Sequence, residues 1–248
     1  MASALLLGSG GWIPTSRRET CSAYVREGDH VLVIDAGTGI HRLIEHPDLL
    51  EGVTQLDIVL THFHLDHTAG LSYLPALPLV PVVWGPGALN YGMPTEEILG
   101  RLLGSPLFAA TPAELTAAVK EIQREQFQIG PFALSSRTQR LHTDPTLALR
   151  VGDTLAYCTD TAADPGNEEF AAGCRVFCHE AWYPQDTTDD ETHSAAGEAG
   201  RIASAAGVEQ LVLIHVSPLL ASDDELAAAA RAEFENAAVG EDLVPLVS

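Results

Sequence analysis

Short apolar segments recur along the chain, and most have the length of buried strands rather than of helices. Their branched aliphatic residues predict β-strands at Ala4–Leu7, Val31–Asp35, Leu56–Thr61, Val80–Val83, Ala133–Ser136, Leu147–Val151, Thr154–Cys158, Val176–Cys178 and Leu211–His215. Helical patterns lie between them, at Thr68–Leu74, Glu96–Leu103, Pro112–Lys120, Ala195–Ala206 and Asp223–Ala237. Strands that alternate with helices predict an α/β fold whose sheets are covered by helices.

The sequence has no internal repeat or low-complexity linker that would mark a domain boundary. A chain of 248 residues fits one large domain, so we interpret 1–248 as a single domain. Residues 84–128 are rich in glycine, proline and helical signals. We expect this stretch to be an insertion, which serves as a lid over one end of the sheets or as a dimer contact.

The most informative segment is Thr61-His62-Phe63-His64-Leu65-Asp66-His67, which directly follows a predicted strand. It places three imidazoles and a carboxylate within six residues. These are ligands that zinc accepts. In an extended turn His62 and His64 point the same way, because side-chain direction repeats every two residues, so they can bind one metal ion together. Asp66 and His67 lie where the chain turns into the next helix, and they can bind a second ion nearby.

Three further residues lie at or just after the carboxyl ends of predicted strands, where α/β proteins usually gather their sites. They are His142, Asp160 and His215. Each alone could be an ordinary polar residue of a loop. Together with the histidine-rich segment they give the order His-x-His-x-Asp-His, then His, Asp and His, which is far more specific than its parts.

This order resembles that of the metallo-β-lactamase superfamily over nearly the whole chain. The resemblance implies a four-layer αβ/βα sandwich of two similar halves, with two metal ions in a cleft between the sheet edges. It also implies the ligands: His62, His64 and His142 for the first zinc, Asp66, His67 and His215 for the second, and Asp160 as the bridge between them. Asp35, in an early Asp-x-Gly turn, is expected to support the metal loop through hydrogen bonds.

Three segments resemble the ribonuclease Z and phosphodiesterase branch of this superfamily. The first is the glycine-rich opening Gly8–Thr15, followed by Arg17 and Arg18, which could pair with phosphate oxygens. The second is Cys178-His179-Glu180-Ala181, in which Trp182 replaces the threonine typical of that branch. The third is the helix start at His193. The alternatives are a plain glycine turn, a structural His179–Glu180 pair, and a capping or core histidine at position 193.

The resemblance implies that His193 is not a metal ligand but faces the scissile phosphate, with Glu180 holding it in its charged form. The implied mechanism is attack by a hydroxide that bridges two zinc ions. Asp66 would orient or deprotonate the water, and His193 would stabilise the developing charge or protonate the leaving oxygen. The catalytic candidates are therefore Asp66, His193 and Glu180. Zinc is the expected metal, two ions per chain, although manganese or iron also suits these ligands.

The net charge changes the expected substrate. The chain has 34 acidic and 13 basic residues, a formal charge of −21. Such a surface should repel long polyanions. Two zinc ions, less their acidic ligands and a hydroxide, leave about +1 at the centre itself, which would attract a compact anion. No obvious long Gly/Pro-rich arm of the kind that grips tRNA lies between the metal loop and His142. We therefore expect a small cyclic or nucleotide-like phosphodiester as the substrate.

Other functions stay open beside this hypothesis. One is a ribonuclease Z-type endonuclease that processes tRNA 3′ ends. Another is a carbonyl hydrolase, a lactonase or thioesterase, that uses the same metal site. A third, of a different class, is a non-catalytic protein or an iron-dependent redox protein. The metal loop lacks the extra glutamate that iron-binding relatives favour, which counts against the last alternative.

The remaining features concern location and assembly. The cysteines Cys21, Cys158, Cys174 and Cys178 form no C-x-x-C pair, so we expect buried thiols. No apolar run approaches the roughly 20 residues of a membrane-spanning helix, and the opening segment lacks the features of a signal peptide. We therefore expect a cytoplasmic protein with no membrane partner. A homodimer is implied by the family resemblance alone.

Overall fold

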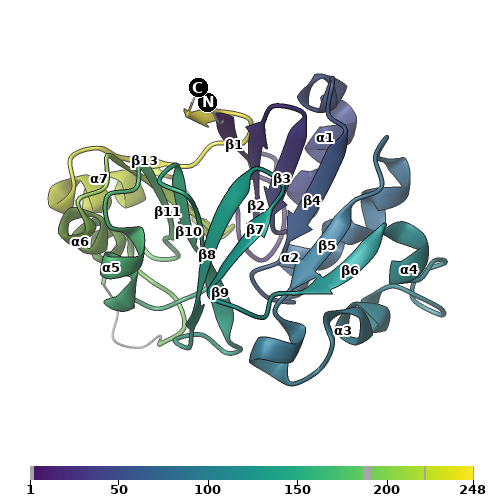
Figure 1. The fold of residues 1–248 in the computed structure, drawn as a ribbon. Helices are drawn as coiled ribbons and strands as arrows, with labels where there is room; N and C mark the ends of the chain where they lie inside the picture. Colours follow the sequence, from purple (N-terminus) through teal and green to yellow (C-terminus); the bar gives the residue numbers. More distant parts are fainter. Residues whose placement is uncertain (1–2, 187–190, 221, 248) are drawn as a thin grey trace.

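The computed structural model describes residues 3–186, 191–220 and 222–247, so the first two residues and the last residue of the predicted domain lie outside it. Two seven-stranded sheets face each other in the middle of the molecule (Figure 1). The first sheet contains, in spatial order, β14 (Pro245–Val247), β1 (Ser3–Gly8), β2 (Ser22–Glu27), β3 (His30–Ile34), β4 (Gln55–Val59), β5 (Val82–Gly85) and β6 (Ala118–Glu121).

The second sheet repeats this arrangement from the other half of the chain. It contains, in spatial order, β13 (Ala237–Val239), β12 (Gln210–Ile214), β11 (Val176–Glu180), β10 (Leu155–Cys158), β9 (Thr146–Val151), β8 (Phe132–Gln139) and β7 (Gln126–Ile129). In each sheet four neighbouring strands run parallel: β3 to β6 in the first and β10 to β13 in the second. The carboxyl ends of the parallel strands therefore meet at one edge of each sheet, which is where the site lies.

Helices cover the outer faces of both sheets (Figure 1). On the side of the second sheet they are α5 (Gly166–Ala171), α6 (Ala196–Ala206) and α7 (Asp224–Glu233). On the side of the first sheet lie α1 (Arg42–Glu45), α2 (Leu65–Thr68), α3 (Thr95–Leu102), α4 (Pro112–Leu115) and short turns η1 (Thr38–His41), η2 (Pro47–Leu50), η3 (Ala69–Ala76) and η4 (Gly87–Tyr91). The order helix, sheet, sheet, helix is the predicted four-layer sandwich. In the described part of the chain, no helix has the length and apolarity to cross a membrane.

Alternation along the strands builds the core in three layers. Leu32 and Ile34 of β3 point inward to the layer between the sheets, whereas Val31 and Val33 point outward to the helices. The outer layer of the second sheet is rich in alanine, and α6 lies close to α7. A Cβ on Gly200 would lie 2.8 Å from the carbonyl oxygen of Ala230, so small residues are what permit this close packing.

The cysteines are free and buried, as predicted. Burial raises the pKa of Cys21 to about 12, so this thiol is not a nucleophile near neutral pH. The thiols belong to the packed interior of the two sheets and not to the chemistry at the sheet edges.

Two predicted helices are wrong at their ends. The helix expected at Pro112–Lys120 stops at Leu115, and Ala118–Glu121 pairs with β5 as an edge strand. The helix expected at Asp223–Ala237 ends at Glu233, and Ala237 begins β13. Helical periodicity continues through both boundaries, but the residues that follow each helix pair with the open edge of a sheet, whose backbone groups would otherwise lack hydrogen bonds. The strand β2 was not predicted, because Ser22–Glu27 mixes polar and apolar residues.

Residues 84–128 contribute to the edges of both sheets. They contain the end of β5, then η4, α3, α4 and β6, and the start of β7. Tyr91 in η4 donates its hydroxyl to the carbonyl oxygen of Pro145, 2.8 Å away, and its ring packs on Phe63 of the metal loop. This stretch therefore contacts the loop that carries the histidines.

Candidate metal centre

One group of ligand-type side chains gathers where β4, β8 and β10 end. It comprises His62, His64, His142 and Asp160, whose candidate donor atoms lie within 4.8 Å of one another. The Nε2 atom of His142 is 3.4 Å from Nδ1 of His64. One oxygen of Asp160 is 3.8 Å from Nε2 of His62 and 3.6 Å from Nε2 of His142. Four donors thus converge on one point, which suits a single ion.

A second group lies beside the first. It comprises Asp66 and His67 of α2 and His215, which follows β12, and its donor atoms also lie within 4.8 Å of one another. Asp66 Oδ2 is 3.2 Å from Nε2 of His215 and 3.6 Å from Nε2 of His67. Residues from the two halves of the chain therefore meet across the gap between the sheets.

Asp160 connects the two groups. Its Oδ2 is 3.1 Å from Nε2 of His67, and its Oδ1 is 3.3 Å from Nε2 of His215. It also reaches His62 and His142 of the first group. The structure therefore brings together all seven residues that the sequence singled out as metal ligands, with Asp160 in the middle. The donors divide between the two groups as the resemblance implied.

The chemistry of these side chains fits metal ions. The Nε2 atoms of His62 and His67 are buried, and neither makes a hydrogen bond to any part of the chain that the structure describes. Such atoms are costly unless something binds them. Burial lowers the pKa of His62 well below its ordinary value, so the ring is neutral and offers a lone pair. Imidazoles beside two carboxylates form a donor set suited to zinc, and also to manganese or iron.

The electrostatics around His67 also favour a bound cation. Burial lowers the pKa of His67, but the carboxylates of Asp160, Asp66 and Asp35 outweigh burial and raise it well above its ordinary value. The three carboxylates thus create a negative potential at His67 that favours a positive charge there. A divalent ion would supply the missing positive charge.

Asp35 fixes the metal loop from beneath. Its Oδ2 accepts a hydrogen bond from Nδ1 of His67 at 2.8 Å, and its Oδ1 accepts from the backbone nitrogen of Thr61 at 2.7 Å. The carboxyl group is fully buried. By holding the proton on Nδ1, Asp35 directs Nε2 of His67 to the centre. This is the supporting contact expected for the Asp-x-Gly turn.

Asp144 is a supporting residue that the sequence reasoning missed. Its Oδ2 lies 3.0 Å from Nε2 of His64, so the carboxylate accepts from Nε2 and leaves Nδ1 to face His142 and the centre. Asp144 is half exposed, with 51% of its side chain accessible. The available signal was a carboxylate two residues after His142, in the same strand-end loop.

The loop residues at the centre have unusual backbone conformations. Positive φ angles occur at Trp12, Asp35, Asp160 and His215, with values of 63°, 62°, 50° and 51°. Residues other than glycine rarely adopt this region, and each instance costs on the order of 1–3 kcal/mol. Among non-glycine residues of the described chain, only Leu243 shares it. Backbone strain is therefore concentrated at the metal centre, as is common for functional sites.

The glycine-rich opening packs against the second group. A Cβ on Gly11 would lie 2.6 Å from Nε2 of His215, so only glycine fits there. Of the two arginines expected to pair with phosphate, Arg18 is buried and its terminal nitrogens bind Asp223 at 2.7 and 3.2 Å, so Arg17 is the one that stays a candidate. Arg17 also points one nitrogen at Asp223, 3.5 Å away. These arginines tie the opening loop to the start of α7.

Glu180 and His193 form a pair beside the two donor groups, in which the glutamate is fully buried and 17% of the histidine side chain is accessible. Nδ1 of His193 lies 2.9 Å from Oε2 of Glu180, and Glu180 also accepts from the backbone nitrogen of Thr161. The ring of Trp182 stacks on His193 with 4.9 Å between centroids and 20° between planes. The ring of His193 lies 5.0 Å from that of His142 and 5.5 Å from that of His215. His193 therefore stands beside both groups, and with Glu180 and His215 it forms a third cluster whose candidate donor atoms lie within 4.8 Å of one another. That His193 is not a metal ligand stays a prediction.

His179 points the other way. Neighbouring residues of β11 alternate between its faces, so His179 packs edge-on against Phe177 and its Nδ1 contacts the carbonyl oxygen of Glu180. It is fully buried. Of the pair His179–Glu180, only the glutamate contacts His193 beside the metal centre.

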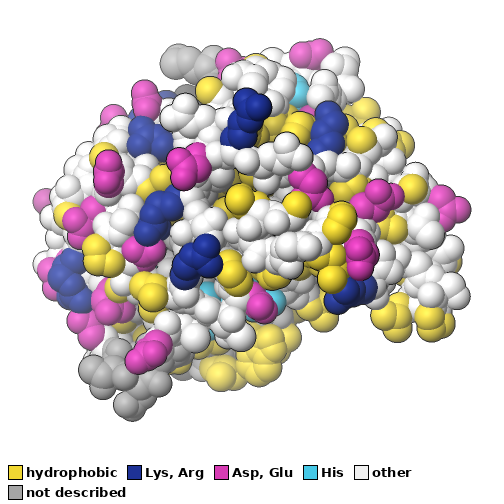
Figure 2. All heavy atoms as spheres, turned by 60° about the horizontal axis from the view of Figure 1, so that its bottom comes forward, with side chains coloured by type: hydrophobic (Ala, Val, Ile, Leu, Met, Phe, Trp, Pro, Cys, Tyr) yellow, Lys and Arg dark blue, Asp and Glu magenta, His cyan; other side chains and the backbone are white. Residues whose placement is uncertain are grey.

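Figure 2 turns the lower end of the molecule in Figure 1 to the front. Histidine side chains are visible there, with hydrophobic side chains beside them and basic and acidic side chains interspersed around them (Figure 2). The face is thus less uniformly acidic than the charge of −21 suggests. A small anion can approach the histidines without crossing a continuous acidic surface.

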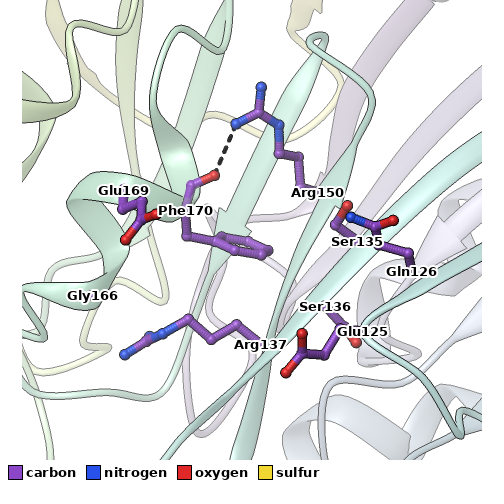
Figure 3. A pocket seen from close by; sticks show the side chains of 9 residues that line it. All are labelled: Glu125, Gln126, Ser135, Ser136, Arg137, Arg150, Gly166, Glu169 and Phe170. Atoms are coloured by element: carbon purple, nitrogen blue, oxygen red, sulfur yellow. Dashed lines mark hydrogen bonds between the residues drawn. The ribbon is translucent and has the colours of Figure 1, made fainter.

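A separate cavity of about 600 Å³ lies over β8, β9 and α5 (Figure 3). The ring of Phe170 stands between Arg137 and Arg150 (Figure 3). Both arginines are engaged within the protein: Arg150 donates to the carbonyl oxygen of Phe170 at 2.9 Å, and Arg137 donates to Asp164 at 2.6 Å. None of the candidate metal-binding residues lines this cavity. Its arginines serve to hold α5 on the sheet.

Comparison with protein families identifies one that covers most of the chain. The model of the family described as "Beta-lactamase superfamily domain" matches residues 30–216. This range includes all the candidate metal-binding residues, together with Glu180 and His193. It leaves out the glycine-rich opening and α7.

Curated relatives match over nearly their full length. A protein named ribonuclease Z from Mycolicibacterium gilvum is 27% identical over 286 aligned positions, which cover 98% of this chain and 95% of the relative. A protein of the same name from Clostridium acetobutylicum is 25% identical over 308 positions, with 98% and 96% covered. Both alignments are longer than 248 residues, so these relatives contain inserted segments that this chain lacks.

Solved structures share the fold. The metallo-β-lactamase fold protein YhfI from Bacillus subtilis has a TM-score of 0.81 and 21% identity, and covers all of this chain and 99% of its own. A diphosphatase from the PhnP family has a TM-score of 0.76 and 18% identity, with 100% and 98% covered. The short form of human tRNase Z has a TM-score of 0.68 and 18% identity, with 99% and 98% covered.

Proposed function

The chain belongs to the beta-lactamase superfamily, and from this membership and the metal centre we propose that it is a metal-dependent hydrolase of phosphodiester bonds. The observation that carries the proposal is the pair of donor groups joined by Asp160, with the His193–Glu180 pair beside both. The metal groups are shared by hydrolases of many kinds. A buried glutamate that holds a histidine over the same cleft is what favours an anionic substrate that releases an alkoxide.

The proposed ligands of the first ion are His62, His64 and His142, and those of the second are Asp66, His67 and His215, with Asp160 between them. Two ions held here would act as Lewis acids on the phosphoryl oxygens and lower the pKa of water, so that a nucleophile exists near neutral pH. We propose zinc as the resident metal because neutral imidazoles dominate the donor set, with manganese and iron as alternatives.

His193 is the proposed general acid. Glu180 is fully buried, and its carboxylate accepts a hydrogen bond from Nδ1–H of His193. This contact stabilises a positive charge on the imidazole ring. The parallel ring of Trp182 holds the imidazole in one orientation. His193 can then donate its second proton, on Nε2, to the oxygen that leaves phosphorus. The charged ring also attracts the phosphate before the reaction.

Asp66 has a proposed second task beside metal binding. Its Oδ2 already accepts the backbone N–H of Trp12 at 2.7 Å and faces His215. These contacts fix the carboxylate in one rotamer. A fixed carboxylate beside the reacting water can orient it or take its proton.

We propose a small phosphodiester, cyclic or nucleotide-like, as the substrate. The charge of −21 opposes a long polyanion. The inserted segments of the ribonuclease Z relatives, absent here, agree with a smaller substrate. The second candidate is a ribonuclease Z-type endonuclease that processes tRNA 3′ ends, which the names of those near full-length relatives favour.

A substrate panel on metal-analysed protein tests these proposals. It contains bis(p-nitrophenyl) phosphate, 2′,3′- and 3′,5′-cyclic nucleotides, a precursor tRNA, a phosphomonoester, a lactone and a thioester. We expect turnover of the small diesters and weak or no cleavage of the tRNA. Cleavage of tRNA with a kcat/KM above that of the small diesters supports the second candidate. Lactone or thioester hydrolysis without diester hydrolysis contradicts both and supports a carbonyl hydrolase.

Matched variants assign the activity to the centre. His64→Ala removes one donor of the first group and should abolish turnover. His46→Ala removes a histidine that lies after α1, away from the centre, and should retain it. The variants also exclude a contaminating esterase, because a contaminant would co-purify equally with both when they are purified by the same procedure.

We propose that the part of residues 84–128 that lies between β5 and β6 acts as a lid, because Tyr91 contacts Pro145 and Phe63 next to the centre. A single domain, a homodimer and a cytoplasmic location stay predictions. Light scattering during gel filtration measures the oligomeric state directly.

A further inference from the structure

Trp12 has a backbone conformation that large residues rarely adopt. Its φ angle is +63°, and its backbone nitrogen donates to Oδ2 of Asp66 at 2.7 Å. The preceding Gly11 lies directly against the ring of His215. Glycine would adopt the same conformation at position 12 without steric cost. The turn therefore does not require an indole, and its presence there needs another explanation.

The indole does not serve the core. Trp12 is 57% exposed, although its backbone is bonded to a residue of the metal centre. Other exposed apolar residues flank the same centre: Leu65 stands between His64 and Asp66 and is 64% exposed, and Leu141 precedes His142. Figure 2 shows hydrophobic side chains next to the histidines on this face. Exposed apolar side chains around a group of polar residues are typical of a ligand-binding surface.

We propose that Trp12 forms an aryl-binding subsite, where its indole stacks on a planar group that the substrate carries next to its phosphate. A nucleobase or another aromatic ring fits this chemistry. The inference rests on the proposed phosphodiesterase function and adds the chemical class of the ester group. The hydrogen bond from the backbone nitrogen of Trp12 to Asp66 connects the subsite to the centre, because Asp66 is a proposed metal ligand.

Stacking explains the combination of strain and exposure. Every base has a π face, so a tryptophan platform binds aromatic groups with little preference among them. The strained turn places the indole outside the packed interior, while the hydrogen bond to Asp66 fixes the backbone of Trp12. A substrate with only alkyl ester groups would gain much less from this contact.

Calorimetric titration with two inert anions tests the proposal. Phenylphosphonate and methylphosphonate present the same anionic group and differ in the ring. We expect the metal-loaded wild-type protein to bind phenylphosphonate about tenfold more tightly, the size of one stacking contact. Trp12→Gly keeps the backbone N–H and favours the positive φ, so it should reduce the ratio of the two dissociation constants to about one or two. Trp12→Phe should retain most of the ratio.

Three controls make the result specific. Val80→Gly removes a side chain that is 65% exposed and precedes β5, at the end of the strands opposite the centre, and should leave the ratio unchanged. Trp12→Gly should keep the metal content of the wild type. Its thermal midpoint should not fall, because glycine relieves the strain.

The outcomes separate this inference from the proposed function. A preference for phenylphosphonate that survives in Trp12→Gly overturns the subsite, and so does a wild-type protein with no preference. Hydrolysis of bis(p-nitrophenyl) phosphate is measured on the same preparations. Its absence from the wild type contradicts the proposed function, and the subsite is then judged by the binding ratio alone.

Discussion

The two donor groups of the metal centre differ in what lies behind them. In the group of Asp66, His67 and His215, the carboxylate that supports His67 is Asp35, which is fully buried, and the buried Glu180 lies 3.9 Å from Nδ1 of His215 without a hydrogen bond to it. In the group of His62, His64 and His142, the carboxylate behind His64 is the half-exposed Asp144, and His64 itself is 34% exposed. The second ion is therefore expected to be held rigidly inside the protein, whereas the first lies nearer to solvent and should exchange more readily.

This difference matters for both stability and catalysis. A buried carboxylate such as Asp35 carries a large desolvation cost when its hydrogen-bond partner is lost. Contacts within the second group are therefore expected to contribute to the free energy of unfolding. A half-exposed carboxylate is partly screened by water, so Asp144 contributes orientation more than stability. The two groups thus offer a comparison within one molecule between a site built into the core and a site built on its surface.

Replacing Asp35 should give the largest effect. Asp35→Ala removes the acceptor for Nδ1 of His67 and for the backbone of Thr61 in the fully buried region. We expect the free energy of unfolding to fall by about 3 kcal/mol or more, with loss of one metal ion per chain. Chemical denaturation and metal analysis measure the two effects. As a control, Asp153→Ala removes an exposed ion pair with Arg150 and should cost no more than about 1 kcal/mol. An equal effect of the two substitutions contradicts the proposed support.

Replacing His193 should separate catalysis from metal binding, because its ring stands beside both groups. His193→Ala should lower kcat on small diesters on the order of 100-fold, while both metal ions remain. Steady-state kinetics and metal analysis on the same sample check this. His46→Ala is the matched control and should keep the wild-type kcat. A His193→Ala variant with full rate on every diester tried excludes its role as the acid.

Replacing Asp144 should give the smallest effect and should act on the first ion alone. Asp144→Asn removes the charge that accepts from Nε2 of His64, and we expect the affinity of one metal ion to fall about tenfold. The free energy of unfolding of the metal-free protein should change little, because the residue is half exposed. Competition with a graded chelator measures each ion's affinity. If both ions weaken equally, the two groups are not independently supported.

The seven candidate ligands could be found from sequence because they lie close together or at strand ends. His62 to His67 form one short run, and His142, Asp160 and His215 each lie at or just after the end of a predicted strand. The α/β class was predicted because apolar strands alternate with helical patterns along most of the chain, and the four-layer arrangement was implied by the family resemblance. These features depend on local spacing and on a strand order that the resemblance supplied.

Other features depend on contacts that no local pattern encodes. Asp144 is one polar loop residue among many until the fold brings His64 to it across 80 positions. Arg18 resembled a phosphate ligand, but Asp223, more than 200 positions away, takes its guanidinium group. The segment at Ala118–Glu121 has a helical pattern, and only the open edge of β5 turns it into a strand. Nothing in the sequence around Trp12 indicated its strained backbone.

The central claim is that the chain holds two metal ions, one in each donor group. Anomalous diffraction from crystals grown with zinc, recorded on both sides of the zinc absorption edge, tests it most directly. We predict two peaks on either side of Asp160, one among His62, His64 and His142 and the other among Asp66, His67 and His215. A map with no peak at these side chains, or with zinc bound only elsewhere on the protein, would contradict the account.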